Sequence, residues 1–264
     1  MTTSTDSPSS PGLLVDEPAP HVRRITLDRP ARMNALDGPT LQAFQEVVRA
    51  SAAPESGVRV LVIRGNGRAF CAGNDLKWLA SGVLDKPVEH MRHQDRMQET
   101  FQLLEDAAFV VIASVNGFAL AGGFELTLAC DIIVADERAE LGDEHIRRNL
   151  LPSGGSSQRL PRRIGLHRAL FYLLTGRRLS GREAVEIGLA ALAVPGEELE
   201  RATLQLAADI AQADPLALAS MKRLARQALQ VPLTEGLQLE RWAQLRYRQQ
   251  SPSLEAGVRK FAGQ

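Results

Sequence analysis

The sequence lacks the features that mark several classes of protein. Only two cysteines, Cys71 and Cys130, occur among its 264 residues, too few for the disulfide framework of a small secreted protein. Its 31 Lys and Arg residues balance its 31 Asp and Glu residues, so net charge indicates neither a nucleic-acid nor a membrane-surface partner. We therefore expect a reducing, cytoplasmic setting, no nucleic acid and no membrane.

Long apolar runs are also missing. The most apolar stretch, residues 107–115 (AAFVVIASV), is far shorter than the roughly 20 residues of a membrane helix. The first twelve residues (MTTSTDSPSSPG) have no charged start followed by an apolar core, which predicts a disordered tail over 1–12 rather than a signal peptide. The remaining composition, 44% hydrophobic and 23% charged, is that of a soluble globular protein.

Strand-like and helix-like patterns alternate after the tail. Residues 21–30 alternate in the manner of a half-buried strand that stops at Pro30. Residues 40–53 space their apolar side chains at helical intervals, with Thr40 as the expected N-cap. Residues 58–67 form a continuous apolar run ending in a glycine-rich turn, as a buried strand does. The order strand, helix, strand predicts an α/β fold.

The pattern repeats and then changes character. Residues 109–117 are typical of another buried strand, residues 124–130 of a helix, and residues 131–142 of two short strands. From about residue 196 the sequence is helix-periodic, with almost no strand signal. We therefore divide the chain into an α/β core over 13–195 and a C-terminal helical module over 196–264.

Two glycine-rich turns, residues 68–79 and 115–126, each follow a buried strand. Ligands of α/β sheets bind in loops at the carboxyl ends of strands, so the two turns predict one shared site. A helix that begins after Gly122 or Gly123 would present free N–H groups, and such groups can hold a developing oxyanion. The alternative is that these glycines serve only tight turns and close packing.

Six segments carry a more specific signal. They are 27–37 (LDRPARMNALD), 69–77 (AFCAGNDLK), 115–135 (VNGFALAGGFELTLACDIIVA), 151–165 (LPSGGSSQRLPRRIG), 175–190 (TGRRLSGREAVEIGLA) and 255–261 (EAGVRKF). In this order and spacing, the chain resembles the crotonase family of CoA-thioester enzymes, which includes enoyl-CoA hydratase. The resemblance implies a spiral of strand-strand-helix turns, followed by helices that form a homotrimer or a dimer of trimers. It also implies no metal and no cofactor besides the coenzyme A of the substrate.

The resemblance assigns roles to four residues. The backbone N–H groups of Cys71 and Gly122 would hold the thioester oxygen. In this role only the backbone of Cys71 takes part, so its thiol need not be reactive. Glu125 takes the position of the first of two family glutamates, and it would activate water at the alkene. The alternative for Glu125 is a surface glutamate on an amphipathic helix. The second family glutamate, twenty positions on, is replaced here by His145.

His145 allows three interpretations. Histidine can act as a general acid or base near neutral pH, with Asp143 or Glu144 orienting the imidazole. It can instead be a structural residue at a helix start. Metal binding through Asp143 and His145 is the least favoured, because two ligands without a third fall short of usual coordination.

Basic residues in or beside the matched segments are candidates to hold coenzyme A, since cationic side chains, arginine above all, suit phosphate. The resemblance implies a C-terminal phenylalanine and lysine from a neighbouring subunit as further contacts, for which Phe261 and Lys260 are the candidates. The expected binding residues are Arg29, Arg32, Arg68, Ala69, Lys77 and Phe261.

The segment over 78–101 is expected to line the acyl pocket. Met91 and Met97 would give it adaptable apolar surface. His90 and His93 are expected to be exposed helix residues, with a substrate role as the minor alternative.

The leading hypothesis from the resemblance is an enoyl-CoA hydratase, a lyase that adds water to a 2-enoyl-CoA or eliminates it. A family isomerase relies mainly on the acid at position 145, so it is disfavoured by histidine there. The alternatives are hydrolysis or C–C cleavage of a β-keto or cyclic acyl-CoA by Glu125 and His145, and a non-catalytic acyl-CoA binding protein.

Overall fold

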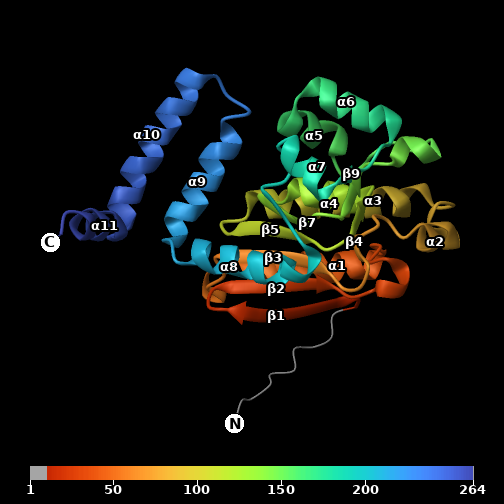
Figure 1. Cartoon of the computed structure of the whole chain (residues 1–264), viewed down its shortest axis with the longest axis horizontal. Helices are drawn as coiled ribbons and strands as arrows, with labels where there is room; N and C mark the ends of the chain where they lie inside the picture. Colours follow the sequence, from red (N-terminus) through yellow and green to blue (C-terminus); the bar gives the residue numbers. More distant parts are fainter. Residues whose placement is uncertain (1–10, 264) are drawn as a thin grey trace, which may run out of the picture.

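The computed structural model describes residues 11–263 (Figure 1). The predicted tail over 1–12 therefore lies, except for its last two residues, outside the described residues. The described strands form two sheets. The larger sheet has the order β1 (Leu13–Ala19), β2 (Val22–Leu27), β3 (Val60–Gly65), β5 (Val110–Val115), β7 (Ile132–Asp136), β10 (Leu192–Val194). The smaller sheet has the order β4 (Ala69–Cys71), β6 (Phe118–Leu120), β8 (Glu140–Gly142), β9 (Leu179–Ser180).

The chain winds between these sheets in a repeating path. Strands β3, β5 and β7 of the larger sheet are each followed at once by β4, β6 and β8 of the smaller sheet, and neighbouring strands run parallel within both sets. Parallel strands need crossover connections, which helices supply here. The helices of this part are α1 (Gly38–Ala52), α2 (Leu76–Trp78), α3 (Pro87–Asp106), α4 (Gly122–Ala129), α5 (Ser156–Ile164), α6 (Leu166–Thr175) and α7 (Gly181–Glu186). Short non-α turns complete it: η1 (Pro30–Arg32), η2 (Pro54–Ser56), η3 (Leu79–Val83) and η4 (His145–Arg148).

Apolar side chains are buried on both faces of the larger sheet. On one face a core joins the sheet to α1, α3 and α4, with Phe44, Phe101 and Phe124 among its fully packed residues. On the other face the valines of β2 and β3 pack under α8 (Leu199–Ala211), through Leu199 and Ala207. Burial on both faces explains why the central strands are continuous apolar runs in the sequence.

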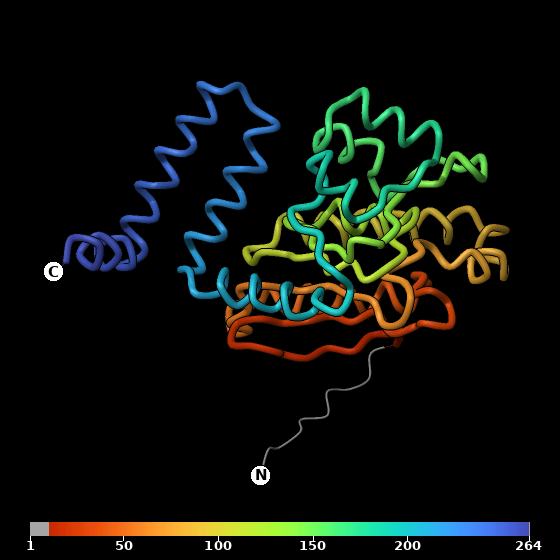
Figure 2. Tube along the Cα trace, viewed as in Figure 1, coloured from red at the N-terminus to blue at the C-terminus, as the bar shows by residue number. Residues whose placement is uncertain are grey.

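The elements described after residue 195 are helical: η5 (Gly196–Glu198), α8, α9 (Pro215–Gln227), α10 (Leu233–Gln250) and α11 (Ser253–Phe261). Helix α8 lies along the sheet, whereas α10 and α11 stand away from it (Figures 1 and 2). A partly buried ion-pair group holds α9 to the core. Lys222 Nζ lies 2.8 Å from Asp131 Oδ2, and Arg226 contacts both Asp131 and Glu105 at 2.8 Å.

The start of α1 differs from the prediction. Asp37, not Thr40, is the N-cap, and its carboxylate accepts a hydrogen bond from the Thr40 backbone N–H at 2.9 Å. Both residue types are good caps, but Pro39 sits at the start of the helix, where the fixed φ of proline is tolerated. The cap therefore has to precede the proline. No helix within residues 11–263 is long and apolar enough to cross a membrane.

Candidate active site

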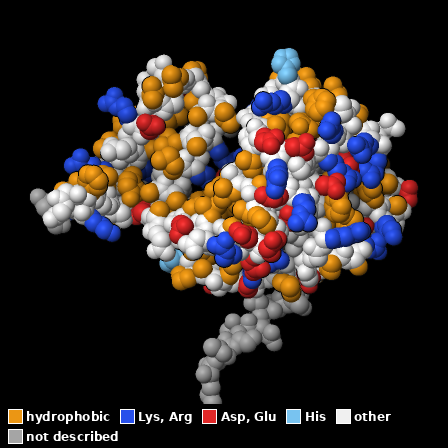
Figure 3. Space-filling model, in the orientation of Figure 1, with side chains coloured by type: hydrophobic (Ala, Val, Ile, Leu, Met, Phe, Trp, Pro, Cys, Tyr) orange, Lys and Arg blue, Asp and Glu red, His pale blue; other side chains and the backbone are white. Residues whose placement is uncertain are grey.

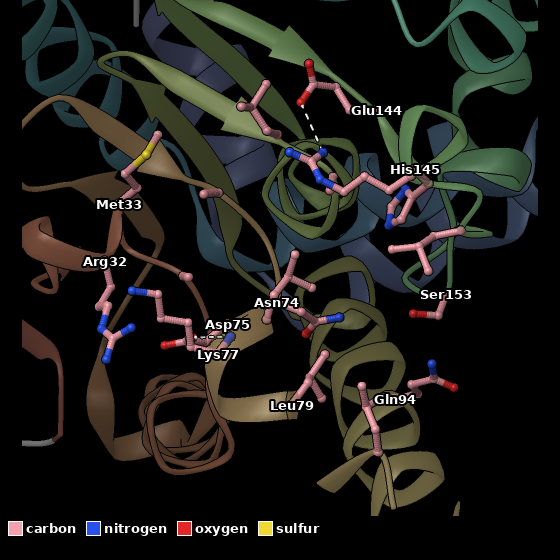
Figure 4. A pocket seen from close by; sticks show the side chains of 18 of the residues that line it. Arg32, Met33, Asn74, Asp75, Lys77, Leu79, Gln94, Glu144, His145 and Ser153 are labelled. Atoms are coloured by element: carbon pink, nitrogen blue, oxygen red, sulfur yellow. Dashed lines mark hydrogen bonds and ion pairs between the residues drawn. The ribbon is translucent and has the colours of Figure 1, made fainter. Parts of the chain in front are cut away.

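A cavity of about 680 Å³ opens between the glycine-rich turns, η4 and the segment after β4 (Figure 4). One side carries Arg32, Met33 and Lys77, and the other carries Gln94, Ser153 and His145. The cavity thus has a basic end, and its other end places Gln94 and Ser153 beside the histidine. Glu144, Arg148 and Arg178 also line the cavity.

The end of β4 and the start of α4 meet at the cavity. A Cβ placed on Gly73 would lie 2.6 Å from the Gly122 backbone nitrogen, and one on Gly122 would lie 3.2 Å from Gly73 Cα. Only glycine permits this approach. Ala72 and Ala121, which adjoin Cys71 and Gly122 in the chain, line the cavity, whereas Cys71 and Gly122 themselves are not among its lining residues.

Ala121 makes the sharp turn from β6 into α4. Its φ of +50° and ψ of −120° are unfavourable for a residue with a Cβ. The first hydrogen bond of α4 runs from the Glu125 N–H to the Ala121 carbonyl at 3.0 Å. The N–H of Gly122 therefore has no partner within the helix. Strain of this kind persists where the surrounding structure imposes it, as at a ligand-binding turn.

The Cys71 side chain is unsuited to nucleophilic chemistry. It is completely buried, and burial raises the pKa of its thiol to about 12. The thiol is therefore protonated at neutral pH, and only the thiolate is a strong nucleophile. Any role of Cys71 in the reaction belongs to its backbone.

Glu125 lies inside the protein, so the alternative of a surface glutamate is wrong. Its exposure is 0%. Oxygen Oε1 accepts a hydrogen bond from the Ser156 backbone N–H at 3.0 Å, and Oε2 has no partner among the described residues. A Cβ on Gly154 would lie 2.6 Å from Oε2, so glycine there leaves room beside this buried oxygen. Glu125 does not itself line the cavity, and its carboxylate lies behind the wall next to Ser153.

His145 lines the cavity and is held from behind by Asp143. Atom Nδ1 lies 3.0 Å from Asp143 Oδ2, off the direction of an aligned hydrogen bond, so the contact is an ion pair. The His145 backbone N–H also donates to Asp143 Oδ1 at 3.3 Å. The Ser156 hydroxyl donates to Asp143 Oδ2. With Nδ1 turned toward Asp143, Nε2 is the ring nitrogen left for the cavity.

The three titratable groups influence one another. Burial opposes the charged form of His145, but the Asp143 carboxylate and then Glu125 favour it, and the net result is a raised His145 pKa. Burial raises the pKa of Glu125, and the Ser156 N–H and His145 only partly oppose this. Burial acts against ionised Asp143 too, yet its bonds from His145 and Ser156 prevail and lower its pKa. The site therefore favours a cationic His145 beside an anionic Asp143.

Glu144 has a different partner from the one its position suggested. Its buried carboxylate accepts a hydrogen bond from Arg178 Nε at 2.6 Å, so only Asp143 orients the imidazole. Ser156 was not among the residues singled out from the sequence. Nothing in its local pattern distinguishes it from the neighbouring Ser157, because its role comes from contacts with residues 13 and 31 positions away.

The basic candidates separate into two groups. Arg32, Arg68 and Lys77 line the cavity. Arg29 does not: its guanidinium lies 2.7 Å from Asp37 and 3.0 Å from Asp75, where it braces the loop before α1.

Two further binding candidates lie outside the cavity wall. Ala69 has a buried side chain in β4, and its carbonyl accepts a hydrogen bond from Asn34 at 2.7 Å. Phe261 is 96% exposed at the end of α11, which stands away from the cavity of its own chain. Lys260, in the same helix, is likewise exposed.

The segment over 78–101 lines the cavity through Leu79, Leu84 and Gln94 rather than through its methionines. The prediction for Met91 and Met97 is wrong, because Met91 points to solvent and Met97 is buried in the core. The prediction that His93 is exposed is also wrong: its side chain is buried. His90, half-buried, lies in the cavity wall. Within the described chain no three His, Cys, Asp or Glu side chains are placed to hold a metal ion.

Comparison with known proteins identifies the family of the chain. The family model described as enoyl-CoA hydratase/isomerase matches residues 18–264. The chain is 36% identical over 217 residues to the 2,3-dehydroadipyl-CoA hydratase of Escherichia coli (strain K12), a match that covers 82% of this chain and 83% of that protein. It is 36% identical over 227 residues to the carnitinyl-CoA dehydratase of Proteus mirabilis (strain HI4320), covering 86% and 85%.

The fold agrees as well. A crystal structure of the enoyl-CoA hydratase from Bacillus anthracis superposes with a TM-score of 0.90 at 36% identity, covering 96% of this chain and 97% of that one. The expected fold class, a crotonase-like α/β spiral with C-terminal helices, is confirmed. The resemblance seen in the sequence is likewise confirmed by the family match. The chain belongs to the enoyl-CoA hydratase/isomerase family, the crotonase family.

Proposed function

We propose that the protein is an enoyl-CoA hydratase that adds water across the Cα=Cβ bond of a 2-enoyl-CoA, and catalyses the reverse elimination. The observation that supports this most is the pairing of a buried glutamate, Glu125, with a cavity-facing histidine, His145, that is held toward its cationic form. One group suits the role of base and the other that of acid, and such paired roles are set by environments that differ.

The proposed reaction has two proton transfers, one from water to Glu125 and one from His145 to Cα. The free oxygen Oε2 of Glu125 accepts a proton from water as the water oxygen bonds to Cβ. The π electrons move toward the thioester and leave an enolate oxygen, which the backbone N–H groups of Cys71 and Gly122 hold. His145 then gives its Nε2 proton to Cα. A proton passed from Glu125 to His145 through solvent restores both groups.

The contacts around the two groups explain why each keeps its role. Ser156 donates its backbone N–H to Glu125 and its hydroxyl to Asp143, so one residue positions both the base and the carboxylate behind the acid. Arg32, Arg68 and Lys77 line the basic end of the cavity, where they would contact the phosphates of coenzyme A. A direct test is whether purified protein converts crotonyl-CoA to 3-hydroxybutyryl-CoA, followed by loss of the enoyl absorbance.

The pH dependence of hydration should reveal the Asp143 contact. Activity needs ionised Glu125 and protonated His145. In acid, kcat should fall as Glu125 becomes protonated, at a pKa above the usual carboxyl range. In alkali, kcat should fall as His145 loses its proton, at a pKa above the usual imidazole value. Asp143→Asn removes the anion that favours the imidazolium, so the alkaline limb should move to lower pH. The rate at the alkaline end should fall by about 3- to 10-fold.

The control for this pH profile is Asp209→Asn, which makes the same change on the exposed side of α8. It should leave both limbs unchanged. An unmoved alkaline limb in Asp143→Asn would show that Asp143 does not act through His145.

The C-terminal helices would bind other copies of the chain. Hydrophobic side chains gather on them in Figure 3, and Leu233, Leu237, Trp242 and Leu245 of α10 are exposed. Exposed apolar surface of this extent marks an interface. It supports assembly as a homotrimer or a dimer of trimers, in which Phe261 of one subunit would come near the coenzyme A of another.

A further inference from the structure

The turn beside Glu125 is built from glycine. Gly154 and Gly155 directly precede α5, and Gly155 has a φ of +101°. The next residue, Ser156, donates its backbone N–H to Glu125 Oε1 at 3.0 Å. Glycine has no side chain with which to fix a turn, and its backbone is the least restricted of all residues. The position of the Ser156 N–H therefore depends on contacts that other side chains make with this turn.

Two side chains hold the turn by its carbonyl groups. Gln98 of α3 donates to the Ser153 carbonyl at 2.6 Å, and Arg159 Nη1 donates to the Gly154 carbonyl at 2.6 Å. Arg159 reaches Gly154 by folding back over Gly155, where a Cβ would clash with Nη1. A hydrogen bond from a guanidinium is charge-assisted, so the bond from Arg159 is the stronger of the two.

Arg159 occupies an unusual place for a basic residue. It lies in the first turn of α5, where the helix dipole disfavours a cation, and only 17% of its side chain is exposed. Its other donors make a two-point contact with Glu105 of α3: Nε lies 3.0 Å from Oε1, and Nη2 lies 2.6 Å from Oε2. One planar guanidinium thus joins α3 to the glycine turn, which the single ammonium of lysine could not do with the same geometry.

Glu105 extends this contact to the C-terminal helices. Its Oε1 also lies 2.8 Å from Nη1 of Arg226, which belongs to α9. Burial acts against ionised Glu105, yet the contacts with Arg159 and then Arg226 prevail and lower its pKa. The carboxylate is therefore ionised at neutral pH and holds both guanidinium groups. Helix α9 is connected in this way to the turn that carries Ser156.

We propose that Arg159 is a positioning residue for the catalytic base. By holding the Gly154 carbonyl, it keeps the Ser156 N–H on Glu125. Glu105 in turn keeps the guanidinium of Arg159 in place. The inference rests on the proposed function, because it takes Glu125 as the base of hydration. Arg159 is not among the residues that line the cavity, so it acts on the base and not on the bound ester.

Arg159→Met keeps much of the length of the side chain and removes every donor. Its kcat for crotonyl-CoA should fall by about 10- to 100-fold, because a slightly displaced catalytic group can cost that much. KM should change little. These constants come from initial rates over a range of crotonyl-CoA concentrations.

The acid limb of the kcat profile should move as well. Burial raises the pKa of Glu125, and the Ser156 N–H is the strongest of the groups that oppose this, ahead of His145. The charged groups beside Glu125 are His145, which lowers its pKa, and Asp143, which raises it. When the Ser156 contact weakens in Arg159→Met, the pKa of Glu125 should rise. The acid limb should then lie about half to one pH unit higher than in wild type.

A double variant separates positioning from a general loss of structure. If Arg159 acts through Glu125, adding Arg159→Met to a protein that already carries Glu125→Gln should lower kcat by less than about 3-fold further. A purely structural role would lower kcat equally in both backgrounds.

Two weaker variants support the same comparison. Arg159→Lys keeps the charge without the planar group, so its kcat should lie about 3- to 10-fold below that of wild type, with a smaller rise of the acid limb. It decides the question if Arg159→Met does not fold. Glu105→Gln keeps one oxygen for Arg159 and should lower kcat by less than Arg159→Met does. The matched control is Arg162→Met on the exposed side of α5, where the guanidinium donates to a carbonyl of its own helix. It should keep the wild-type kcat and pH profile.

Three results would overturn the inference. They are a wild-type kcat in the folded Arg159 variants, an acid limb that does not move in them, and an equal loss of kcat with and without Glu125→Gln. Each would leave the proposed hydratase intact, since the wild-type protein would still hydrate crotonyl-CoA. Absence of that activity from the wild type would overturn the proposed function together with this inference.

Discussion

Replacing Glu125 with glutamine is expected to lower kcat for hydration of crotonyl-CoA by about 10²- to 10⁴-fold, the usual contribution of a general base. The change keeps the volume of the side chain and leaves an amide oxygen that can still accept from the Ser156 N–H. It removes Oε2, a buried carboxylate oxygen that has no hydrogen-bond partner among residues 11–263. Because the loss lies in the proton transfer, KM should change little. Initial rates over a range of crotonyl-CoA concentrations measure both constants.

The matched control is Glu46→Gln, which makes the same substitution at an exposed position of α1. It should retain the wild-type rate. If Glu125→Gln kept more than a third of wild-type kcat, Glu125 would not be the base, and its burial would need a structural explanation. Thermal unfolding of both variants separates a catalytic effect from a loss of fold.

Replacing His145 with alanine should lower kcat by about 10²- to 10³-fold, because the proton for Cα would have to come from solvent. His145→Glu should recover a substantial part of this loss. The adjacent Asp143 anion disfavours a second negative charge, so the introduced carboxyl would have a raised pKa and could remain a proton donor. The pH profile checks this, since the alkaline limb of His145→Glu should differ from that of the wild type.

An exposed histidine provides the comparison for these variants. His167 lies on the outer side of α6, and His167→Ala should have the wild-type rate and pH profile. If His145→Ala and His145→Glu both hydrated crotonyl-CoA at nearly the wild-type rate, the histidine would be only a structural residue at the start of η4.

Much of the fold could be predicted because its signals are local. The strands β3 and β5 are buried on both faces, so each is a short, mainly apolar run, with a glycine at its end (Gly65) or two residues after it (Gly117). The glycine-rich turns mark the ends of these strands, and the resemblance placed Glu125 and His145 twenty residues apart in one site. The start of α1 was misplaced by a few residues, because Thr40 and Asp37 are both good caps and only Pro39 distinguishes them.

The features that escaped prediction depend on contacts between distant residues. His93 and Met97 lie four residues apart on one buried face of α3. Most residues around them are polar, so the sequence pattern does not indicate that this face is buried. Arg29 is engaged by Asp37, at the end of its own segment, and by Asp75, 46 residues further along the chain, a contact that the local sequence does not reveal. The double role of Ser156 likewise depends on tertiary packing, which no periodicity encodes.

The most direct test of the proposed chemistry is to identify the product formed from crotonyl-CoA in water enriched in both ¹⁸O and deuterium. The account predicts 3-hydroxybutyryl-CoA with ¹⁸O on Cβ, one deuterium on Cα and an intact thioester, seen by mass spectrometry. The Glu125→Gln variant should form it only at the reduced rate. Release of free coenzyme A with ¹⁸O in a carboxylic acid, or recovery of unchanged crotonyl-CoA, would contradict it.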